Sequence, residues 1–191
     1  MDPRAARTQG RLQDALLELA RERPLDEITV GDITDRAAVN RSSFYQHYSD
    51  KDTLLADALE RVIDDVSDQL RARAEPLPLG MPEELQQYLA HLAANAPLYR
   101  RVLGEHGSTV VTARLRRRVE RIVSETIDAV DSPAFVGIPL DVVAAGIAGT
   151  ALGVITAWIA RDPVPPLEVA SNWLWQVLTG PGVVAVAEGD V

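Results

Sequence analysis

The stretch from Thr29 to Lys51, TVGDITDRAAVNRSSFYQHYSDK, decides the fold of the N-terminal part of the chain. Its pattern predicts two short helices joined by a tight turn. Thr29 can cap the first helix, and Asp32 three residues later completes a capping-box-like start with negative charge at the positive end of the helix dipole. This helix should end near Ala38. Asn40 is a second cap signal only two residues later, which leaves room for a tight turn and nothing more.

The second helix has two different faces. Phe44 and Tyr48 fall on one face and can dock, whereas Gln46 lies about 160° from Phe44 at roughly 100° per residue. The free face begins with short polar side chains beside a long cationic one, which would let the helix lie close to phosphates and base edges while the arginine reaches a guanine. These residues are Arg41, Ser42, Ser43 and Gln46.

Three further residues around this face could bind the phosphate backbone. Tyr45 and His47 flank the free face and could hydrogen-bond to phosphate oxygens. Lys51, the single lysine of the chain, stands at the start of the next helix, where backbone N–H groups and positive charge together favour a phosphate. Capped helix pairs are also plain scaffolding in all-α proteins, so the pair alone leaves DNA binding and a structural role open.

Taken whole, the segment resembles the DNA-binding part of the tetracycline-repressor (TetR) family of bacterial regulators. The resemblance rests on four short pieces: Ile28-Thr29-Val30, the polar cap Asn40, Tyr45-Gln46-His47-Tyr48 and Lys51-Asp52-Thr53-Leu54. It implies DNA-binding roles for Thr29, Asn40 and the residues of the second helix. One departure is visible, because the family usually has glycine in the turn where this chain has Ala37-Ala38-Val39. If Ala38 needs a positive φ, a strain of about 1 kcal/mol follows.

The overall charge places most of the acid away from this segment. The chain has 191 residues, 47% of them hydrophobic, no cysteine and a net charge of −9. Residues 1–51 carry eight cationic and nine acidic side chains, so nearly all the excess acid belongs to the remainder, where it would suppress non-specific binding. Arg4, Arg7 and Arg11 add positive charge at the N-terminus, where an arm could reach the backbone or minor groove. The absent cysteine and the polar N-terminus favour a cytoplasmic protein.

Helical patterns continue through the rest of the chain, so we expect an all-α fold. A first helix over 8–23 completes a three-helix helix-turn-helix headpiece at residues 1–50. A helical ligand-binding and dimerisation body is expected over 51–180, with a disordered tail at 181–191. The body begins with a long helix over 51–73 and a proline-rich loop over 75–82. Its further helices are predicted at 83–94, 97–103, 109–130, 140–159 and 166–178.

The segment from Val142 to Ala160 contains 19 residues without a charge, long enough to pass a filter for membrane spans. We interpret it as a buried helix, because it is rich in alanine and glycine and lacks flanking cationic clusters. Ala145, Gly149 and Gly153 form a ridge of small residues that would let another helix approach closely. The resemblance implies that the two C-terminal helices pair with their copies across a two-fold axis.

Two other groups of residues have alternative interpretations. A cationic stripe on the helix over 109–130 could be a second nucleic-acid surface, although a solvated face that balances acids such as Glu120 and Glu125 is favoured; it consists of Arg114, Arg117, Arg118 and Arg121, with Arg116 beside it. A set of apolar and aromatic residues could line the effector cavity that the resemblance implies, or could be ordinary core; these are Tyr88, Leu92, Tyr99, Trp158 and Trp173.

The functional prediction is a ligand-responsive transcriptional regulator, most simply a repressor. A homodimer would bind a palindromic double-stranded DNA operator, and a small-molecule effector would release it. The alternative is an all-α enzyme or a scaffold whose helix pair is structural. No catalytic cluster is expected, since the sequence offers neither a nucleophile with a base nor paired carboxylates. His91 and His106 lack a carboxylate at metal spacing, so no metal and no cofactor are predicted.

Overall fold

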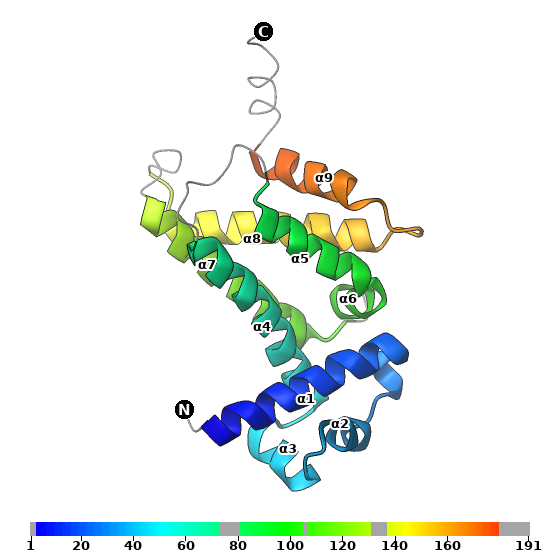
Figure 1. Ribbon diagram of the computed structural model, residues 1–191. Helices are drawn as coiled ribbons and strands as arrows, with labels where there is room; N and C mark the ends of the chain where they lie inside the picture. The colour runs from blue at the N-terminus through cyan, green and yellow to red at the C-terminus, as the bar shows by residue number, and fades with distance from the viewer. Residues whose placement is uncertain (1–2, 73–80, 105–106, 131–136, 180–191) are drawn as a thin grey trace. The chain divides into compact units, whose positions relative to one another are not determined.

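The computed structural model describes residues 3–72, 81–104, 107–130 and 137–179, and every regular element within these ranges is helical. The predicted all-α fold is therefore confirmed (Figure 1). The elements are α1 (Pro3–Glu22), the short 3-10 helix η1 (Leu25–Glu27), α2 (Val30–Ala37), α3 (Arg41–His47), α4 (Lys51–Ala72), α5 (Glu83–Ala94), α6 (Ala96–Leu103), α7 (Thr109–Val130), α8 (Leu140–Ile159) and α9 (Leu167–Thr179).

Packing divides the chain into two compact units. Unit 1 comprises Met1–Val62 with Pro97–Leu115, and unit 2 comprises Ile63–Ala96 with Arg116–Val191. These packing units differ from the domains predicted from the sequence, which divide at residue 50. The predicted boundary marks the end of the DNA-binding domain, and it stays a prediction. The predicted disordered tail at 181–191 lies outside the described residues, as does most of the proline-rich loop over 75–82.

Helix α1 begins earlier than the sequence pattern predicted. Leu12, Leu16 and Leu19 are buried along one face, as their spacing predicts, and the helix ends two residues before Pro24. Its start at Pro3 rather than near residue 8 corrects the prediction. Proline is well suited to the first turn of a helix, because its fixed φ is helical and its missing N–H has no partner there. The N-terminal arginines therefore stand on a helix and not on an extended arm.

The turn between α2 and α3 has the geometry that an alanine adopts only with strain. Ala38 has φ 49° and ψ 50°, which is the left-handed region. In this conformation the Val39 N–H donates to the Thr34 carbonyl oxygen at 2.9 Å, and Ala38 N–H bonds back to α2 as well. The last carbonyl groups of α2 thereby gain partners. The sharp reversal lets α3 begin at Arg41, only four residues after α2 ends.

Unit 2 contains α5, α8 and α9, with α9 packed on both of the others. One face of α8 is buried and includes Ala144, Ala148 and Trp158. The opposite face, with Val142, Gly146 and Gly153, is exposed in the single chain. Among the described residues, α8 is the one helix long and apolar enough to cross a membrane, and 33% of its apolar window is buried. Length and composition are weak evidence for a span, since core helices of soluble proteins meet the same criterion.

Candidate nucleic-acid interface

Helix α3 presents a polar outer face and buries an aromatic inner face. Arg41, Ser42, Tyr45 and Gln46 are exposed, while Ser43 and His47 are half-buried. On the opposite side Phe44 is fully buried and Tyr48, the residue at which α3 ends, is 3% exposed. Their rings lie 5.8 Å apart between centroids. The helix is thus anchored by two aromatic rings and leaves its predicted base-reading side chains at the surface.

Arg41 lies in the segment over residues 29–51. Its guanidinium group has no carboxylate or carbonyl partner among the described residues. Its guanidinium carbon lies 5.9 Å from the centroid of the Tyr45 ring. Tyr45 in turn makes an edge contact with Phe44, 5.2 Å between centroids, although 51% of it is exposed. Stacking on an aromatic face restrains a long arginine side chain without neutralising its charge. Arg41 therefore keeps its full charge at the outer surface of α3.

Arg36, by contrast, is engaged within unit 1. Its Nη1 and Nη2 atoms donate to the two carboxylate oxygens of Glu22, each at 2.8 Å, and Nη1 also lies 3.4 Å from Glu18. The hydrogen bond from Arg36 holds the pKa of Glu22 below its usual range. The positive charge of Arg36 is therefore neutralised by acids of α1, a contact that spacing along the chain does not reveal.

Lys51 also has partners within the chain. Its Nζ donates to the carbonyl oxygen of Leu25 at 2.6 Å and to that of Ile28 at 2.9 Å. The first carbonyl group belongs to the start of η1 and the second to the residue that follows η1, so the ammonium group fixes the entry to the helix pair. This structural role was missed in the sequence, where Lys51 was assigned to phosphate. An ammonium group has three N–H donors, and two of them are used by these carbonyl groups. A phosphate contact through the third donor stays a prediction.

Thr29 forms the predicted capping box with Asp32. The Thr29 side chain accepts from the Asp32 N–H at 3.2 Å, and Asp32 Oδ2 accepts from the Thr29 N–H at 2.8 Å and from its hydroxyl group at 2.6 Å. These bonds, followed by Arg23, hold the pKa of Asp32 well below its usual range. The prediction that the Asn40 side chain caps the second helix is wrong. Asn40 occupies the N-cap position of α3, but its side chain makes no capping hydrogen bond. DNA contacts of Thr29 and Asn40 stay predictions.

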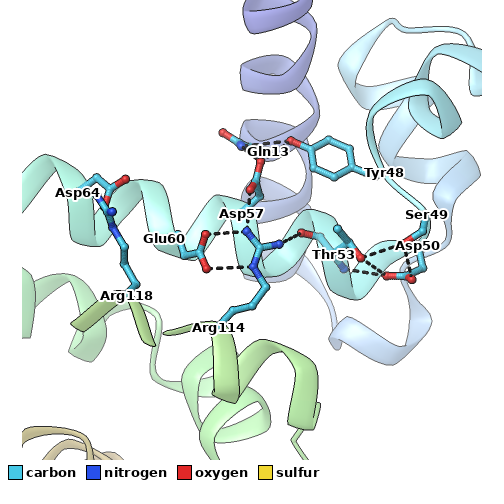
Figure 2. A network of polar contacts seen from close by, with 10 residues as sticks. All are labelled: Gln13, Tyr48, Ser49, Asp50, Thr53, Asp57, Glu60, Asp64, Arg114 and Arg118. Atoms are coloured by element: carbon cyan, nitrogen blue, oxygen red, sulfur yellow. Dashed lines mark hydrogen bonds and ion pairs between the residues drawn. The ribbon is translucent and has the colours of Figure 1, made fainter. Parts of the chain in front are cut away.

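The inner end of α3 is attached to a polar cluster from distant parts of the chain, which Figure 2 shows. The Tyr48 hydroxyl group donates to Asp57 Oδ2 at 3.0 Å, and Gln13 Nε2 donates to Tyr48 Oη at 3.2 Å and to Asp57 Oδ2 at 3.1 Å. On the other carboxylate oxygen, Arg114 Nη2 donates to Asp57 Oδ1 at 2.9 Å. Burial, reinforced by the Asp57 charge, raises the pKa of the Tyr48 hydroxyl group.

The cationic stripe on α7 is divided by these contacts. Arg114 and Arg118 are paired with acids of α4, namely Glu60 with Asp57 for Arg114 and Asp64 for Arg118. Arg116, Arg117 and Arg121 are exposed, and Arg116 pairs with Glu120 one turn away. The interpretation as a single solvated face is therefore wrong for Arg114 and Arg118.

The predicted effector-pocket residues do not fall into one compact unit. Tyr99 belongs to unit 1, while Tyr88, Leu92, Trp158 and Trp173 belong to unit 2. Leu92, Tyr99 and Trp158 are fully buried. The Trp158 indole N–H donates to the Pro165 carbonyl oxygen at 2.9 Å, and the Arg161 guanidinium carbon lies 4.9 Å from the Trp173 ring centroid. These contacts do not distinguish core packing from a pocket lining, and the pocket stays a prediction.

No metal site is formed by the part of the chain that the structure describes, where no group of three potential ligands from His, Cys, Asp and Glu comes together. The buried Ser171 hydroxyl oxygen on α9 is the one buried side-chain polar atom in these residues without a hydrogen-bond partner. A buried hydroxyl group in that state costs free energy unless a partner arrives.

Comparison with known proteins agrees with the geometry of unit 1. Residues 12–58 match the model of the family described as bacterial regulatory proteins, tetR family. Over 84 residues the chain is 33% identical to an uncharacterised HTH-type transcriptional regulator, YxbF, of Bacillus subtilis (strain 168). That match covers 44% of this chain and 22% of the relative, so the chain spans about a fifth of the length of the relative it matches.

Solved structures with the same fold cover nearly all of the chain. A TetR transcriptional regulator from Rhodococcus sp. RHA1 superimposes with a TM-score of 0.66 at 17% identity, covering 94% of this chain and 96% of that one. The TetR-family repressor FadR of Thermus thermophilus, in complex with lauroyl-CoA, gives a TM-score of 0.63 at 19% identity, covering 90% and 93%. At these identities the likeness establishes the fold. The helix pair with its polar outer face and the family match over 12–58 together identify the N-terminal part of the chain as a helix-turn-helix segment of the tetR family of bacterial regulatory proteins.

Proposed function

We propose that this regulator is a ligand-responsive repressor that binds a palindromic DNA operator as a homodimer and is released by a small-molecule effector. The observation that carries the proposal is the two-sided character of α3, with Phe44 and Tyr48 anchored in unit 1 and the Arg41–Gln46 side exposed. In a helix-turn-helix protein the second helix enters the major groove and its exposed residues contact base edges. Such a protein acts in the cytoplasm, where the DNA is.

The exposed face of α8 supports the homodimer. Val142 is 56% exposed and Val177 on α9 is 58% exposed. A Cβ built on Gly146 or Gly153 would meet no other described atom within 4 Å, apart from the adjoining residues and the nearby backbone of α8 itself. Small residues on an open apolar face permit close approach of a second helix. A two-fold axis brings the same face of each copy together, and two half-sites about 34–36 Å apart then match two copies of α3.

The effector is proposed to bind in unit 2. Its helices combine aromatic side chains with the unpartnered Ser171 hydroxyl group, which is the combination of apolar lining and few polar groups typical of ligand sites. Solved relatives include FadR proteins in complex with lauroyl-CoA and with stearoyl-CoA. These two acyl-CoA thioesters are therefore the first probes for this chain, together with a general library of small molecules.

Selection of DNA from a randomised duplex pool tests the proposal. The protein should enrich a two-fold symmetric sequence, and its affinity should fall steeply with salt because cationic groups displace counterions from phosphates. Enrichment of no sequence, or binding that is insensitive to salt, would leave the alternative of an all-α enzyme or scaffold with a structural helix pair.

Thermal shift then tests the effector step, because a ligand that binds only the folded protein raises its stability. A compound found in this way should weaken DNA binding, and DNA should weaken binding of the compound by the same factor. Simultaneous binding with no mutual effect would contradict ligand-controlled release and leave a DNA-binding protein without this switch.

A further inference from the structure

The polar cluster behind α3 joins helices that are far apart in the sequence. Arg114 of α7 binds Glu60 through two bonds, Nε to Oε1 at 3.0 Å and Nη2 to Oε2 at 2.6 Å. Its Nη2 also donates to Asp57 Oδ1 at 2.9 Å. Asp57 then accepts from Tyr48, at which α3 ends. One guanidinium group is therefore separated from Tyr48, at the end of α3, by a single carboxylate (Figure 2).

Arg114 is needed to hold the carboxylates of Asp57 and Glu60 close together. Asp57 and Glu60 are three residues apart on α4 and lie on the same side of that helix, where two carboxylates repel each other. The fork of Arg114 lies against both, with 24% of its side chain exposed. The hydrogen bonds that Arg114 donates to Glu60 and Asp57 hold the Arg114 pKa above its usual value. Without this cation the Asp57 carboxylate would lose the donor on Oδ1, and the neutral amide of Gln13 on Oδ2 would have to hold it toward Tyr48 against the charge of Glu60.

Helix α3 is short enough to depend on such support. It contains seven residues, and a helix of two turns has little stability of its own. Phe44 and Tyr48 provide its buried contacts, and of these two side chains only Tyr48 ends in a hydroxyl group that needs a specific partner. The direction in which Tyr48 is held therefore affects the orientation of the residues that precede it in α3.

We propose that Arg114 is a positioning residue for DNA binding, which acts through Asp57 and the Tyr48 hydroxyl group to fix the orientation of α3. The inference rests on the proposed DNA-binding function and names a residue of α7 that controls it without contacting DNA. Helix α7 includes residues of both compact units. A displacement of α7 that separated the guanidinium group from Asp57 would, on this proposal, change the affinity for DNA.

The test compares four variants of the full chain with the unaltered protein. Arg114→Met removes all N–H donors of the side chain at similar side-chain length, and Arg114→Lys keeps the positive charge without the planar guanidinium group. Tyr48→Phe removes only the hydroxyl group. The fourth variant combines Tyr48→Phe with Arg114→Met. Arg116→Met is the matched control, because Arg116 stands two residues away on α7 and pairs within that helix with Glu120. The DNA probe is a duplex enriched from a random pool by the unaltered protein.

Arg114→Met should bind this duplex about tenfold more weakly, as expected when a hydrogen bond to a charged group is lost. Tyr48→Phe should weaken binding less, and the double variant should bind within about twofold of Arg114→Met alone, because both changes break the same path. Arg114→Lys should be intermediate and Arg116→Met unchanged. The salt dependence should be the same throughout, since no phosphate contact is removed. If the fold-changes of the two single variants multiply in the double variant, the proposal is overturned.

Hydrogen exchange gives a second readout that does not need DNA. Amides of residues 41–47 should exchange faster in Arg114→Met and Tyr48→Phe, while those of the buried part of α1 and all amides of Arg116→Met should keep their rates. If the unaltered protein enriches no duplex, the proposed function fails, and exchange still decides the positioning role. Unchanged exchange in α3 would overturn it. If Arg114→Met does not fold, the pair Tyr48→Phe and Arg114→Lys is measured in the same two ways.

Discussion

Arg11 Nη2 donates to the carbonyl oxygen of Ala38 at 3.0 Å. This bond connects α1 to the turn of the helix pair at the one non-glycine residue with positive φ in the described chain. The turn is thus held from outside at the position where its backbone is strained. Arg11 therefore has a structural role in the headpiece, and its contact to DNA stays a prediction for its other N–H donors.

Ala38→Gly should raise the free energy of unfolding by about 0.5–1 kcal/mol, because relief of the left-handed strain outweighs the added freedom of the unfolded chain. Denaturant unfolding of the two proteins measures the change. Ala38→Val is the matched comparison and should destabilise, since a β-branched side chain tolerates this conformation least. A lower stability for the glycine variant would show that the Arg11 contact already compensates the strain.

Lys51→Ala should lower the free energy of unfolding by about 1–3 kcal/mol, because the carbonyl groups of Leu25 and Ile28 lose a charged donor. Arg61→Ala is a control on the same helix; its exposed ion pair with Asp14 should contribute no more than about 1 kcal/mol. If Lys51 also binds a phosphate, the slope of log affinity against log salt should fall by about one unit. Equal stabilities for the unaltered and Lys51→Ala proteins would contradict the structural role.

Asp50 should make the stability depend on pH in the acidic range. Its Oδ1 accepts from the Thr53 N–H at 2.7 Å at the start of α4. This bond, with the one from Ser49, holds the Asp50 pKa below the ordinary value of 3.8. A lowered pKa means that the contribution is present above the ordinary value and is lost as the pH falls through the folded-state pKa.

Asp50→Asn should therefore be less stable by about 0.3–1 kcal/mol at neutral pH, and the difference should shrink below pH of about 4. Thermal unfolding across this range measures it. Asp65→Asn, at an exposed position in the middle of α4, changes the net charge equally and serves as the control. A difference from the unaltered protein that stays constant down to the acid limit would show that charge at Asp50 contributes nothing.

Gly153→Leu should give monomers if α8 forms the two-fold interface. Beyond the local backbone of α8, no described atom lies within 4 Å of a Cβ at this position. Leucine also favours a helix over glycine by about 0.8 kcal/mol, so the chain itself should fold. Light scattering and sedimentation measure the mass. Ala90→Leu, on the exposed side of α5, is the control and should leave assembly unchanged. An intact Gly153→Leu dimer would place the interface elsewhere.

Arg41→Ala and Gln46→Ala should relax base preference at defined positions of the half-site, each by about 1–3 kcal/mol for a bidentate contact. Repeating the selection from a random pool with each variant measures the preference. Tyr45→Phe is the comparison, since loss of a phosphate contact should weaken binding to all sequences alike. An unchanged selected sequence for both Arg41 and Gln46 variants would remove them from the reading surface.

The local features of the headpiece were predictable, because they depend on residues close together in the chain. Thr29 and Asp32 are three residues apart, and the capping box they form follows from that spacing. Ala38 was identified as the strained position for the same reason. The start of α1 was missed, since Pro3 to Arg7 contains good helix formers but no apolar stripe, and the prediction relied on the stripe.

The partners of charged groups were not predictable, because they come from distant parts of the sequence. Arg114 is 57 residues from Asp57, and a stripe of arginines looks the same whether its members face water or another helix. Lys51 likewise reaches back 26 residues to Leu25. In the sequence, a cation beside a predicted DNA-binding helix indicates a phosphate partner. In the folded chain, backbone carbonyl groups already bind the Lys51 ammonium group.

The open apolar face of α8 has a consequence for how the regulator would respond to its own abundance. If two copies must meet on this face before two α3 helices can occupy one operator, the bound fraction at low abundance rises with the square of the chain concentration. A twofold change in synthesis would then change occupancy by about fourfold in that regime. The small residues of α8 would in this way determine how steeply operator occupancy depends on protein concentration, as the protein accumulates or is diluted by growth.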